Sequence, residues 1–595
     1  MMREFPDRRH FIKRAALTLA GASLHLPARA QAPSPSGTAI YPRLVRANDA
    51  RMSEQGAVAA GAPGFSARGT ANQLQMWAAA YCAPESRYYR SAALVRRMQE
   101  ATTSLLGAQH RDGTIDSGNL QSPPDTAFVV EPLAVAMTNL NRHDSADLTP
   151  LKEGLKTFLL SAGEALTVGG VHTPNHRWGV CAALARIHSL YPAAKYVRRI
   201  EEWLSEGIDI DADGQFSERS VGNYSAVTNN WLIILARLLG RDELLEPVRR
   251  NLELTLYYMH PDGELEAVAS RRQDQWRRNY VHDDRPVPDN LHLPYRYLAL
   301  RDGNGRFAAV TRLIEQNAGD GLGANLAYLL EEPLLRQDLP PVTPLPTEYA
   351  RFFAGSGLVR IRRGDVSASI YGGSDYPLGV ASGLAANPTF FTFRKGSAVL
   401  ESIRMAPHFF RKGFFYSKGV RVQGNRYLLH QRVEVPYYQP LPQEARRPDG
   451  DYALTPAEDR FWSKMNFPAR EMSNIKVVEQ SVTVLEAGRG RFELQVDVSG
   501  PDGVPVTLEL AFRRGGRLVG VAPSPDSKDD YFLEQGMGRY QVDQHAIEFG
   551  PGQAVHRRTR LEGEIFDMHR GSLRADALRV YITAVTPLRE TLTIG

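Results

Sequence analysis

Residues 338–346 read Asp-Leu-Pro-Pro-Val-Thr-Pro-Leu-Pro, with four prolines in seven positions. Each proline fixes its own φ and lacks a backbone donor, so this stretch excludes a regular helix and favours an extended connector. The sequence has a helical period before it and an alternating period after it. We therefore predict a domain boundary here, with a proline-rich connector over residues 338–349.

The segment before the connector has the spacing of amphipathic helices. In the run WGVCAALARIHSLY, apolar side chains recur at Val180, Leu184 and Ile187. Another run, NNWLIILARLLG, ends at Gly240, which suits the position after a helix C-terminus. Such runs with short connections indicate antiparallel helix pairs packed one after another, so we predict a helical domain over residues 69–337.

The segment after the connector has the period of strands. Alternating runs such as SASIYGG, RFELQVDV, VTLELAFRR and LRVYITAV are separated by turns rich in Gly, Pro and Asp. We predict that residues 350–595 form an antiparallel β-sandwich.

The first 30 residues resemble a twin-arginine export signal. Arg8 and Arg9 begin the pattern RRxFxK, a short apolar run follows, and Ala28-Arg29-Ala30 provides a small-residue cleavage site. The alternative is a basic amphipathic helix. The resemblance implies transport by the twin-arginine export machinery into the periplasm. Residues 31–68, rich in Ala, Pro, Gly and Ser, then read as a linker or irregular lead-in.

Composition and charge narrow the class of protein. With 43% hydrophobic and 23% charged residues among 595, the chain suits a large folded protein. It has 71 basic and 66 acidic side chains, of which residues 1–30 hold six and two, leaving 65 against 64. This balance gives no global basic field for a nucleic acid, and no later segment has the roughly 18 uninterrupted apolar residues of a membrane span. Cys82 and Cys181 are too few for a disulfide scaffold or a thiolate metal site.

A first polar cluster, Thr173-Pro-Asn-His-Arg-Trp178, precedes a predicted helix. Thr173 suits the N-cap and proline suits the next position, so Asn175 and His176 fall in the first turn. The free N–H groups and positive end of a helix attract a carboxylate and disfavour a protonated imidazole. A neutral imidazole beside an anion site is what abstraction of a proton needs. The alternative is that both residues only cap or brace the helix.

A second cluster spans Asp209 to Tyr224 and is rich in turn residues. Its DxDxDG start imitates a calcium loop, but the twelfth position is Ser220 and not the bidentate Glu, so we predict no metal. The aspartates instead predict a turn and a helix stop. Tyr224 stands at a loop-to-helix junction, where a phenol is accessible for catalysis or packs at a rim.

Together, the two clusters resemble the helical-domain signature of the heparinase II/III-like polysaccharide lyases, in which an Asn-His pair is followed by a DG-x-F-x-E-x-S loop and a Tyr. The His-to-Tyr gap of 48 residues suits the family. The matching residues are Asn175, His176, Asp213, Gly214, Phe216, Glu218, Ser220 and Tyr224. The resemblance implies an incomplete (α/α) toroid followed by a C-terminal antiparallel β-sandwich.

The resemblance also implies β-elimination at a uronic acid, without metal or organic cofactor. Asn175 and His176, with Arg177, would neutralise the sugar carboxylate and so stabilise the enolate-like charge that develops. Tyr224 would transfer the proton, as base, as acid toward the departing glycosidic oxygen, or as both, and His176 is the rival base. The implied partner is an acidic polysaccharide or oligosaccharide.

Further site candidates lie outside the two clusters. The family supplies a His and often a Tyr from the sandwich, and the best matches are His408 and then Tyr437 or Tyr438, although a structural His among aromatics is an alternative. Residues 271–278 place four arginines around one Trp, which suits either a subsite wall for an acidic glycan or a solvated charged face. The predicted substrate-binding residues are Arg177, Trp178, Glu218, Arg219, Asn223, Arg271, Trp276 and Tyr437.

Two other functions fit the same sequence. A glycoside hydrolase on a helical toroid would use two carboxylates, such as Glu218 with Asp125 or Asp213. A glycan-binding protein could keep the fold without the reaction. The joint presence of Asn175, His176 and Tyr224 favours the lyase.

Overall fold

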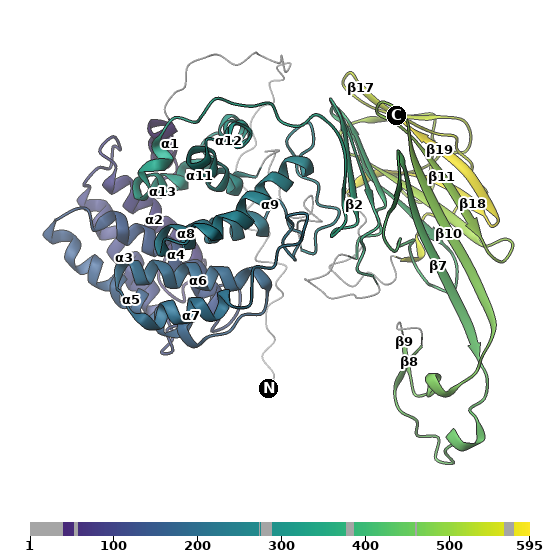
Figure 1. The fold of residues 1–595 in the computed structure, drawn as a ribbon, viewed down its shortest axis with the longest axis horizontal. Coiled ribbons are helices and arrows are strands. Elements are labelled where there is room, and N and C mark those ends of the chain that lie inside the picture. The colour runs from purple at the N-terminus through teal and green to yellow at the C-terminus, as the bar shows by residue number, and fades with distance from the viewer. Residues whose placement is uncertain are drawn as a thin grey trace. The chain divides into compact units, whose positions relative to one another are not determined.

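A computed structural model of the chain describes residues 40–52, 58–272, 274, 288–376, 386–457, 461–563 and 576–595. Helices occupy the part before the proline-rich connector, and strands occupy the part after it (Figure 1). The predicted fold class, helices followed by antiparallel sheets, is confirmed. The export signal predicted over residues 1–30 lies outside the described residues.

Twelve α-helices lie in the described part of the chain. They are α1 (Ile40–Ala50), α2 (Ala67–Cys82), α3 (Ala92–Ala108), α4 (Pro123–Leu140), α5 (Thr149–Val168), α6 (Pro174–Leu190), α7 (Ala194–Leu204), α8 (Tyr224–Leu239), α9 (Leu245–Tyr258), α11 (His292–Asp302), α12 (Gly305–Asn317) and α13 (Leu326–Glu331). Helices α2, α4, α6 and α8 pack on one another in that order, whereas α3, α5, α7 and α9 each pack on the helix before them. This alternation of inner and outer helices is the arrangement of an (α/α) toroid.

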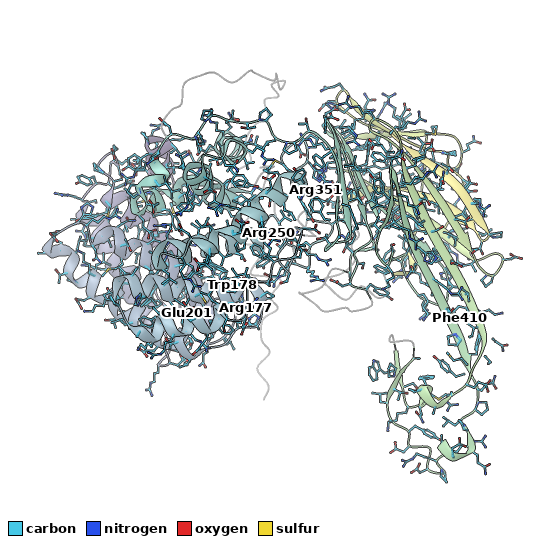
Figure 2. All side chains as sticks on the ribbon, in the orientation of Figure 1. Arg177, Trp178, Glu201, Arg250, Arg351 and Phe410 are labelled. Carbon is cyan, nitrogen blue, oxygen red and sulfur yellow. The ribbon has the colours of Figure 1, made fainter. Side chains whose placement is uncertain are left out.

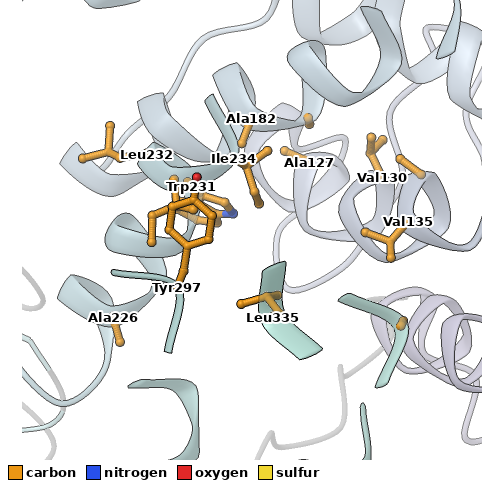
Figure 3. Packing of buried hydrophobic residues seen from close by; sticks show 14 of the residues in the cluster. Ala127, Val130, Val135, Ala182, Ala226, Trp231, Leu232, Ile234, Tyr297 and Leu335 are labelled. Atoms are coloured by element: carbon orange, nitrogen blue, oxygen red, sulfur yellow. The ribbon is translucent and has the colours of Figure 1, made fainter. Parts of the chain in front are cut away.

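Burial differs between the two layers as this arrangement requires. Outer helix α7 is strongly amphipathic and buries only Tyr196 and Ile200. The inner helices α4, α6 and α8 are buried on most sides. Figure 3 shows Val130 of α4, Ala182 of α6 and Ile234 of α8 in one shared core.

Three outer helices, α3, α7 and α9, are followed by the same tight turn. Each turn contains an Asp-Gly pair and closes with a single β-bridge, and the bridges are Gln109 to Ile115, Ile210 to Phe216, and Met259 to Leu265. Gly113 has a positive φ of 87°, a conformation that favours glycine. An added Cβ at this position would also lie 2.0 Å from the carbonyl oxygen of Ser161. The turns reverse the chain toward the next inner helix, and the second of them leads into Tyr224.

Helix α1 lies inside the segment that was predicted to be a linker or irregular lead-in. It buries Leu44 and Val45 in the helical core, and Asn48 donates to the carbonyl of Met76 at 3.1 Å. These contacts are with residues far along the chain, so the helix is stabilised by packing that the local composition does not reveal.

The strands form two large sheets. The nine-stranded sheet has the order β1 (Glu348–Phe353), β2 (Leu358–Arg363), β3 (Val366–Tyr371), β4 (Phe391–Lys395), β5 (Ala398–Pro407), β12 (Pro505–Arg513), β18 (Ala577–Val585), β15 (Asp530–Phe532) and β14 (Ala522–Pro523). The eight-stranded sheet has the order β13 (Arg517–Val519), β16 (Gly538–Val542), β17 (His545–Gly550), β19 (Leu588–Ile594), β11 (Arg491–Ser499), β10 (Met472–Gly488), β7 (Arg426–Tyr438) and β6 (Arg421–Gln423). Neighbours pair antiparallel except β15 with β18, which pair parallel. A second core with residues from both sheets makes this a sandwich.

Strands β7 and β10 belong to the eight-stranded sheet and lead into a small ribbon made of β8 (Thr455–Ala457) and β9 (Phe461–Ser463) (Figure 1). Residues between β7 and β10 are mostly exposed. None of the described helices combines the length and apolar character of a membrane span.

Candidate active site at the start of the inner helices

The site is built on the first turn of helix α6. Thr173 has extended backbone at the N-cap and Pro174 follows it, so Asn175 and His176 lie in the first turn as predicted. The Thr173 hydroxyl makes no capping hydrogen bond, although its position is that of a cap. Both Asn175 and His176 are buried.

The carboxylate at this helix end belongs to the protein itself. Glu218 accepts a 2.7 Å hydrogen bond from the Asn175 side-chain amide. Arg272 donates to the other Glu218 oxygen at 2.6 Å. Burial raises the pKa of Glu218, and the contacts to Arg272 and Asn175 oppose this only in part. The Asn175 amide at the start of α6 is therefore already bound to a carboxylate of the protein.

Arg272 connects this pair to Tyr224. Its guanidinium lies 4.0 Å from the centre of the Tyr224 ring, which is cation–π distance. Tyr224 is the first residue of α8, and its backbone N–H donates to Ser220 at 3.0 Å. Asn175, Glu218, Arg272 and Tyr224 thus form one continuous set of contacts, and Tyr224 remains partly exposed.

A second guanidinium, from Arg68 of α2, acts on the same phenol. Arg68 interacts electrostatically with Tyr224 and with His176. It is held by a 2.9 Å ion pair to Asp125 of α4 and lies 4.1 Å above the Phe128 ring. Arg272 therefore stacks on Tyr224, and Arg68 interacts with it electrostatically.

His176 is held as a neutral imidazole. Its ring makes edge contacts with His172, at 4.9 Å, and with Phe128, at 6.1 Å. Burial lowers the pKa of His176 to about 4, with His172 and nearby arginines acting in the same direction and Asp125 against it. Its Nδ1 is buried and has no hydrogen-bond partner among the described residues. A neutral, unpaired ring nitrogen is able to accept a proton or a hydrogen bond.

Because the pKa of His176 is 6.5 when unfolded and about 4 when folded, the unfolded chain binds more protons between these values. The contribution of His176 to stability is then lost as the pH falls from 6.5 toward 4, by roughly 3 kcal/mol at most. We expect the free energy of unfolding of His176→Gln to fall less over this range than that of the parent, as measured by urea unfolding at several pH values. His430→Gln, which changes an exposed histidine of β7, is the matched control. Parallel pH curves for the parent and His176→Gln would contradict the buried neutral state.

Arg177 and Trp178, which were predicted to bind substrate, both hydrogen-bond to acidic side chains of the protein. Arg177 donates at 3.0 Å to Glu206 and at 3.0 Å to Asp209. Trp178 is completely buried and donates its indole N–H to Asp209 at 3.2 Å. Asp209 also accepts from Ser217 and so ties the start of α6 to the loop that leads to Tyr224.

Arg219 and Arg271, predicted to bind substrate, are used to hold the sandwich. Arg219 donates to the backbone carbonyls of Gly355 and Gly373 at 2.8 and 3.2 Å. Arg271 makes a two-pronged ion pair with Asp375, with both distances 2.9 Å. The helical loops and the loop after β3 are therefore joined beside the site. Asn223 is exposed at the start of α8, and Trp276 lies outside the described residues.

The sandwich candidates lie apart from the helical cluster. His408 is exposed just after β5, with Nδ1 3.8 Å from Glu562, and Tyr437 is exposed on β7. Among the described residues, neither side chain is hydrogen-bonded, ion-paired or stacked with Asn175, His176 or Tyr224. Their roles in the reaction stay predictions.

The sequence reasoning did not single out Arg68, Phe128 or His172, and it included Arg272 only within the arginine-rich run 271–278. Arg68 is the second residue after Ser66, the cap of α2, as Asn175 is the second residue after Thr173, the cap of α6. Phe128 lies further along, in the second turn of α4. A search for polar residues just after each inner-helix cap would have found Arg68.

The carboxylates of the hydrolase alternative are also engaged. Asp125 accepts from Arg68 and, at 2.8 Å, from Asn119, and Asp213 accepts from the backbone N–H of Gly355 at 2.8 Å. The aspartates at the start of the second cluster thus serve as turn and tether. The described residues contain no group of three His, Cys, Asp or Glu side chains placed to hold a metal ion.

No protein-family model and no curated protein sequence matches this chain. Heparinase III superposes with a TM-score of 0.54 at 11% identity, over 88% of this chain and 75% of its own. The Streptomyces coelicolor A3 chondroitin AC lyase gives a TM-score of 0.53 at 13% identity, over 95% of this chain and 80% of its own. A Paenibacillus xanthan lyase gives a TM-score of 0.53 at 9% identity, over 93% of this chain and 56% of its own.

These three proteins are polysaccharide lyases, and the likeness shows that this chain has the polysaccharide lyase fold. The fold that the sequence resemblance implied is therefore confirmed. At these identities, the chemistry has to be argued from the residues of the site.

Proposed function

We propose that this protein is a polysaccharide lyase that cleaves a uronate-containing glycan by β-elimination. The observation that carries the proposal is the position of Arg272, which pairs with Glu218 at 2.6 Å and stacks on Tyr224 at 4.0 Å. Through Glu218, which accepts from the Asn175 amide, Arg272 links this amide to the Tyr224 phenol, and this link supports the proposal.

The chemistry explains why these groups are needed together. The C5 proton of a uronate is poorly acidic while the adjacent carboxylate keeps its charge, because removal of the C5 proton places more negative charge on that carboxylate. Arg272 and Arg68 supply positive charge beside this point, and the Asn175 amide supplies a polar group held by Glu218. Charge that develops on the enolate is stabilised most by groups already in place.

Tyr224 is the proposed proton carrier. In its ionised form, the phenolate oxygen of Tyr224 takes the C5 proton and becomes the neutral phenol, the electrons of the C5–H bond form the C4–C5 double bond, and the C4–O bond to the leaving sugar breaks. The same proton then passes to the departing oxygen, so no water is consumed. His176, neutral at pH 7 because burial lowers its pKa to about 4, is the rival base.

We further propose that the chain acts outside the cytoplasm. The RRxFxK pattern and the Ala-Arg-Ala site in residues 1–30 support export by the twin-arginine machinery into the periplasm.

The test is incubation of the pure protein with alginate, heparin, chondroitin sulfate, glucuronan and plant acidic glycans. We expect at least one of them to yield products with new ultraviolet absorbance from the conjugated double bond. Mass spectrometry provides a second readout, because masses of elimination products add up to the mass of the substrate, whereas hydrolysis adds one water. New reducing ends without absorbance and with an added water would establish a hydrolase instead.

A further inference from the structure

A loop on the sandwich, residues 408–413, leaves the nine-stranded sheet at the same end as the loop that contacts the helical site. Tyr371 and Ile403 both hydrogen-bond to Phe390, so β3 and β5 are level at these residues and run in the same direction. After Tyr371 the chain passes to Asp375, which binds Arg271 beside the site. His408 follows Ile403 by five residues, or roughly 16 Å of strand. The two loops therefore follow the C-terminal ends of β3 and β5 at the same end of the sheet, with β4 between these strands.

Two residues of this loop have positive φ values, and the turn that they form leaves one aromatic ring exposed to solvent. Phe410 and Arg411 have φ values of 48° and 54°, a conformation that costs free energy for residues other than glycine. The preceding Phe409 is buried in the sandwich core, and its N–H donates to the buried Glu562 carboxylate at 2.9 Å. With Phe409 fixed inside, the turn that follows leaves the Phe410 ring 49% exposed.

A second exposed aromatic lies beside Phe410. The Tyr437 ring of β7 is 51% exposed, and its centre is 6.2 Å from that of Phe410, in an edge-to-face arrangement. His408 and Arg411 are exposed on the same loop. Figure 2 labels Phe410 on the sandwich near strands β7 and β10. We name Phe410, Arg411 and Tyr437 the sandwich platform.

We propose that the sandwich platform is a distal binding surface for the acidic glycan, at which sugar units remote from the cleaved bond are held. This inference rests on the proposed lyase function. Aromatic faces pack against the C–H faces of sugars, and the Arg411 guanidinium pairs with carboxylate or sulfate groups. The platform lies at the sheet edge that reaches the helical site, so a long chain is able to contact both.

The neighbouring strand edge argues for a glycan and against a second protein chain. Strand β6 covers only Arg426–Leu428 of β7, which leaves the later part of β7 at the edge of its sheet. That part carries Arg432, Glu434 and Pro436, and charge and proline on an edge oppose pairing with another strand. The exposed rings beside this edge therefore suit a partner, such as a glycan, that does not form β-sheet hydrogen bonds.

The test is affinity electrophoresis of the full chain in gels that contain alginate, heparin or chondroitin sulfate, with neutral dextran as reference. All samples carry Tyr224→Phe, so that the polymer is not degraded. We expect Phe410→Ala with Tyr437→Ala to weaken retention by roughly tenfold in the gel that retains the parent. Trp462→Ala, at a residue that is 61% exposed on β9 and outside the platform, should bind as the parent does. Equal melting temperatures show that the variants are folded.

Each outcome decides the inference. Equal retention of the double variant and the parent, or no retention of the parent by any acidic polymer, would overturn it. Light scattering that shows a dimer lost only in the double variant would assign the platform to self-association instead. Failure of the lyase proposal is seen separately, as an absence of new absorbance with the unmutated protein while retention still depends on the platform.

Discussion

Tyr224→Phe should lower the rate of product formation by about 10²–10⁴-fold while the protein stays folded and still binds the glycan. The substitution removes only the phenolic oxygen and leaves the ring on which Arg272 stacks at 4.0 Å. Without that oxygen, the proposed site has no group at this position to carry the proton from C5 to the leaving sugar. The measurement is the initial rate of ultraviolet absorbance on the glycan found by the panel, with affinity measured in parallel.

The chain offers a matched control for this change. Tyr88 is partly buried and lies under the Arg87 guanidinium at 4.8 Å, so Tyr88→Phe also removes a phenol oxygen beneath an arginine. It should leave the rate unchanged, because Tyr88 lies between α2 and α3 and outside the site. Normal turnover by Tyr224→Phe would rule out Tyr224 as the proton carrier and leave His176 as the base.

Most of the fold could be predicted because its signals are local. The helical period before residue 338 and the alternating period after residue 346 depend only on neighbouring residues, and both are confirmed. Helix α1 was missed because Leu44 and Val45 pack against distant helices, and nothing next to them in sequence reports those partners. The parallel pairing of β15 with β18 is likewise a long-range property.

The site was predictable where residue types and spacing together specify the chemistry. The positions of Asn175 and Tyr224 follow from a helix cap and a loop that the sequence displays. Residue type alone does not give the partners of Arg177 and Arg271, because an arginine that could bind a substrate carboxylate binds a protein carboxylate equally well. The partners of these two, Asp209 and Asp375, became visible only when the chain was folded.

Residue type also could not show which carboxylate lies at the start of helix α6. The positive end of α6 was expected to attract a carboxylate, and the carboxylate found there, bonded to the Asn175 side chain, is that of Glu218. A helix end identifies the charge that it prefers and does not identify the molecule that carries this charge. The positive charge near Tyr224 therefore comes from Arg68 and Arg272, neither of which belongs to the sequence signature.

Asn175→Asp should reduce turnover by about 10³-fold or more at neutral pH. The amide that donates to Glu218 at 2.7 Å becomes a carboxylate, so two acids of like charge lie side by side in a buried site. The pair uses up the positive charge of Arg272 and repels the carboxylate of the sugar. Both effects act on the developing negative charge, and the loss should appear in the initial rate.

The pH dependence of this variant separates electrostatics from loss of shape. Two close carboxylates share a proton more readily as the pH falls, because one protonated member removes the repulsion and restores a donor. Activity of Asn175→Asp relative to the parent should therefore rise between pH 7 and pH 5, whereas Asn175→Ala, which has no charge to lose, should keep a constant ratio. Melting temperatures at each pH show whether both variants remain folded. If both ratios are flat, Asn175 acts by packing and not by charge, and the proposed neutralisation of the sugar carboxylate must rest on the arginines alone.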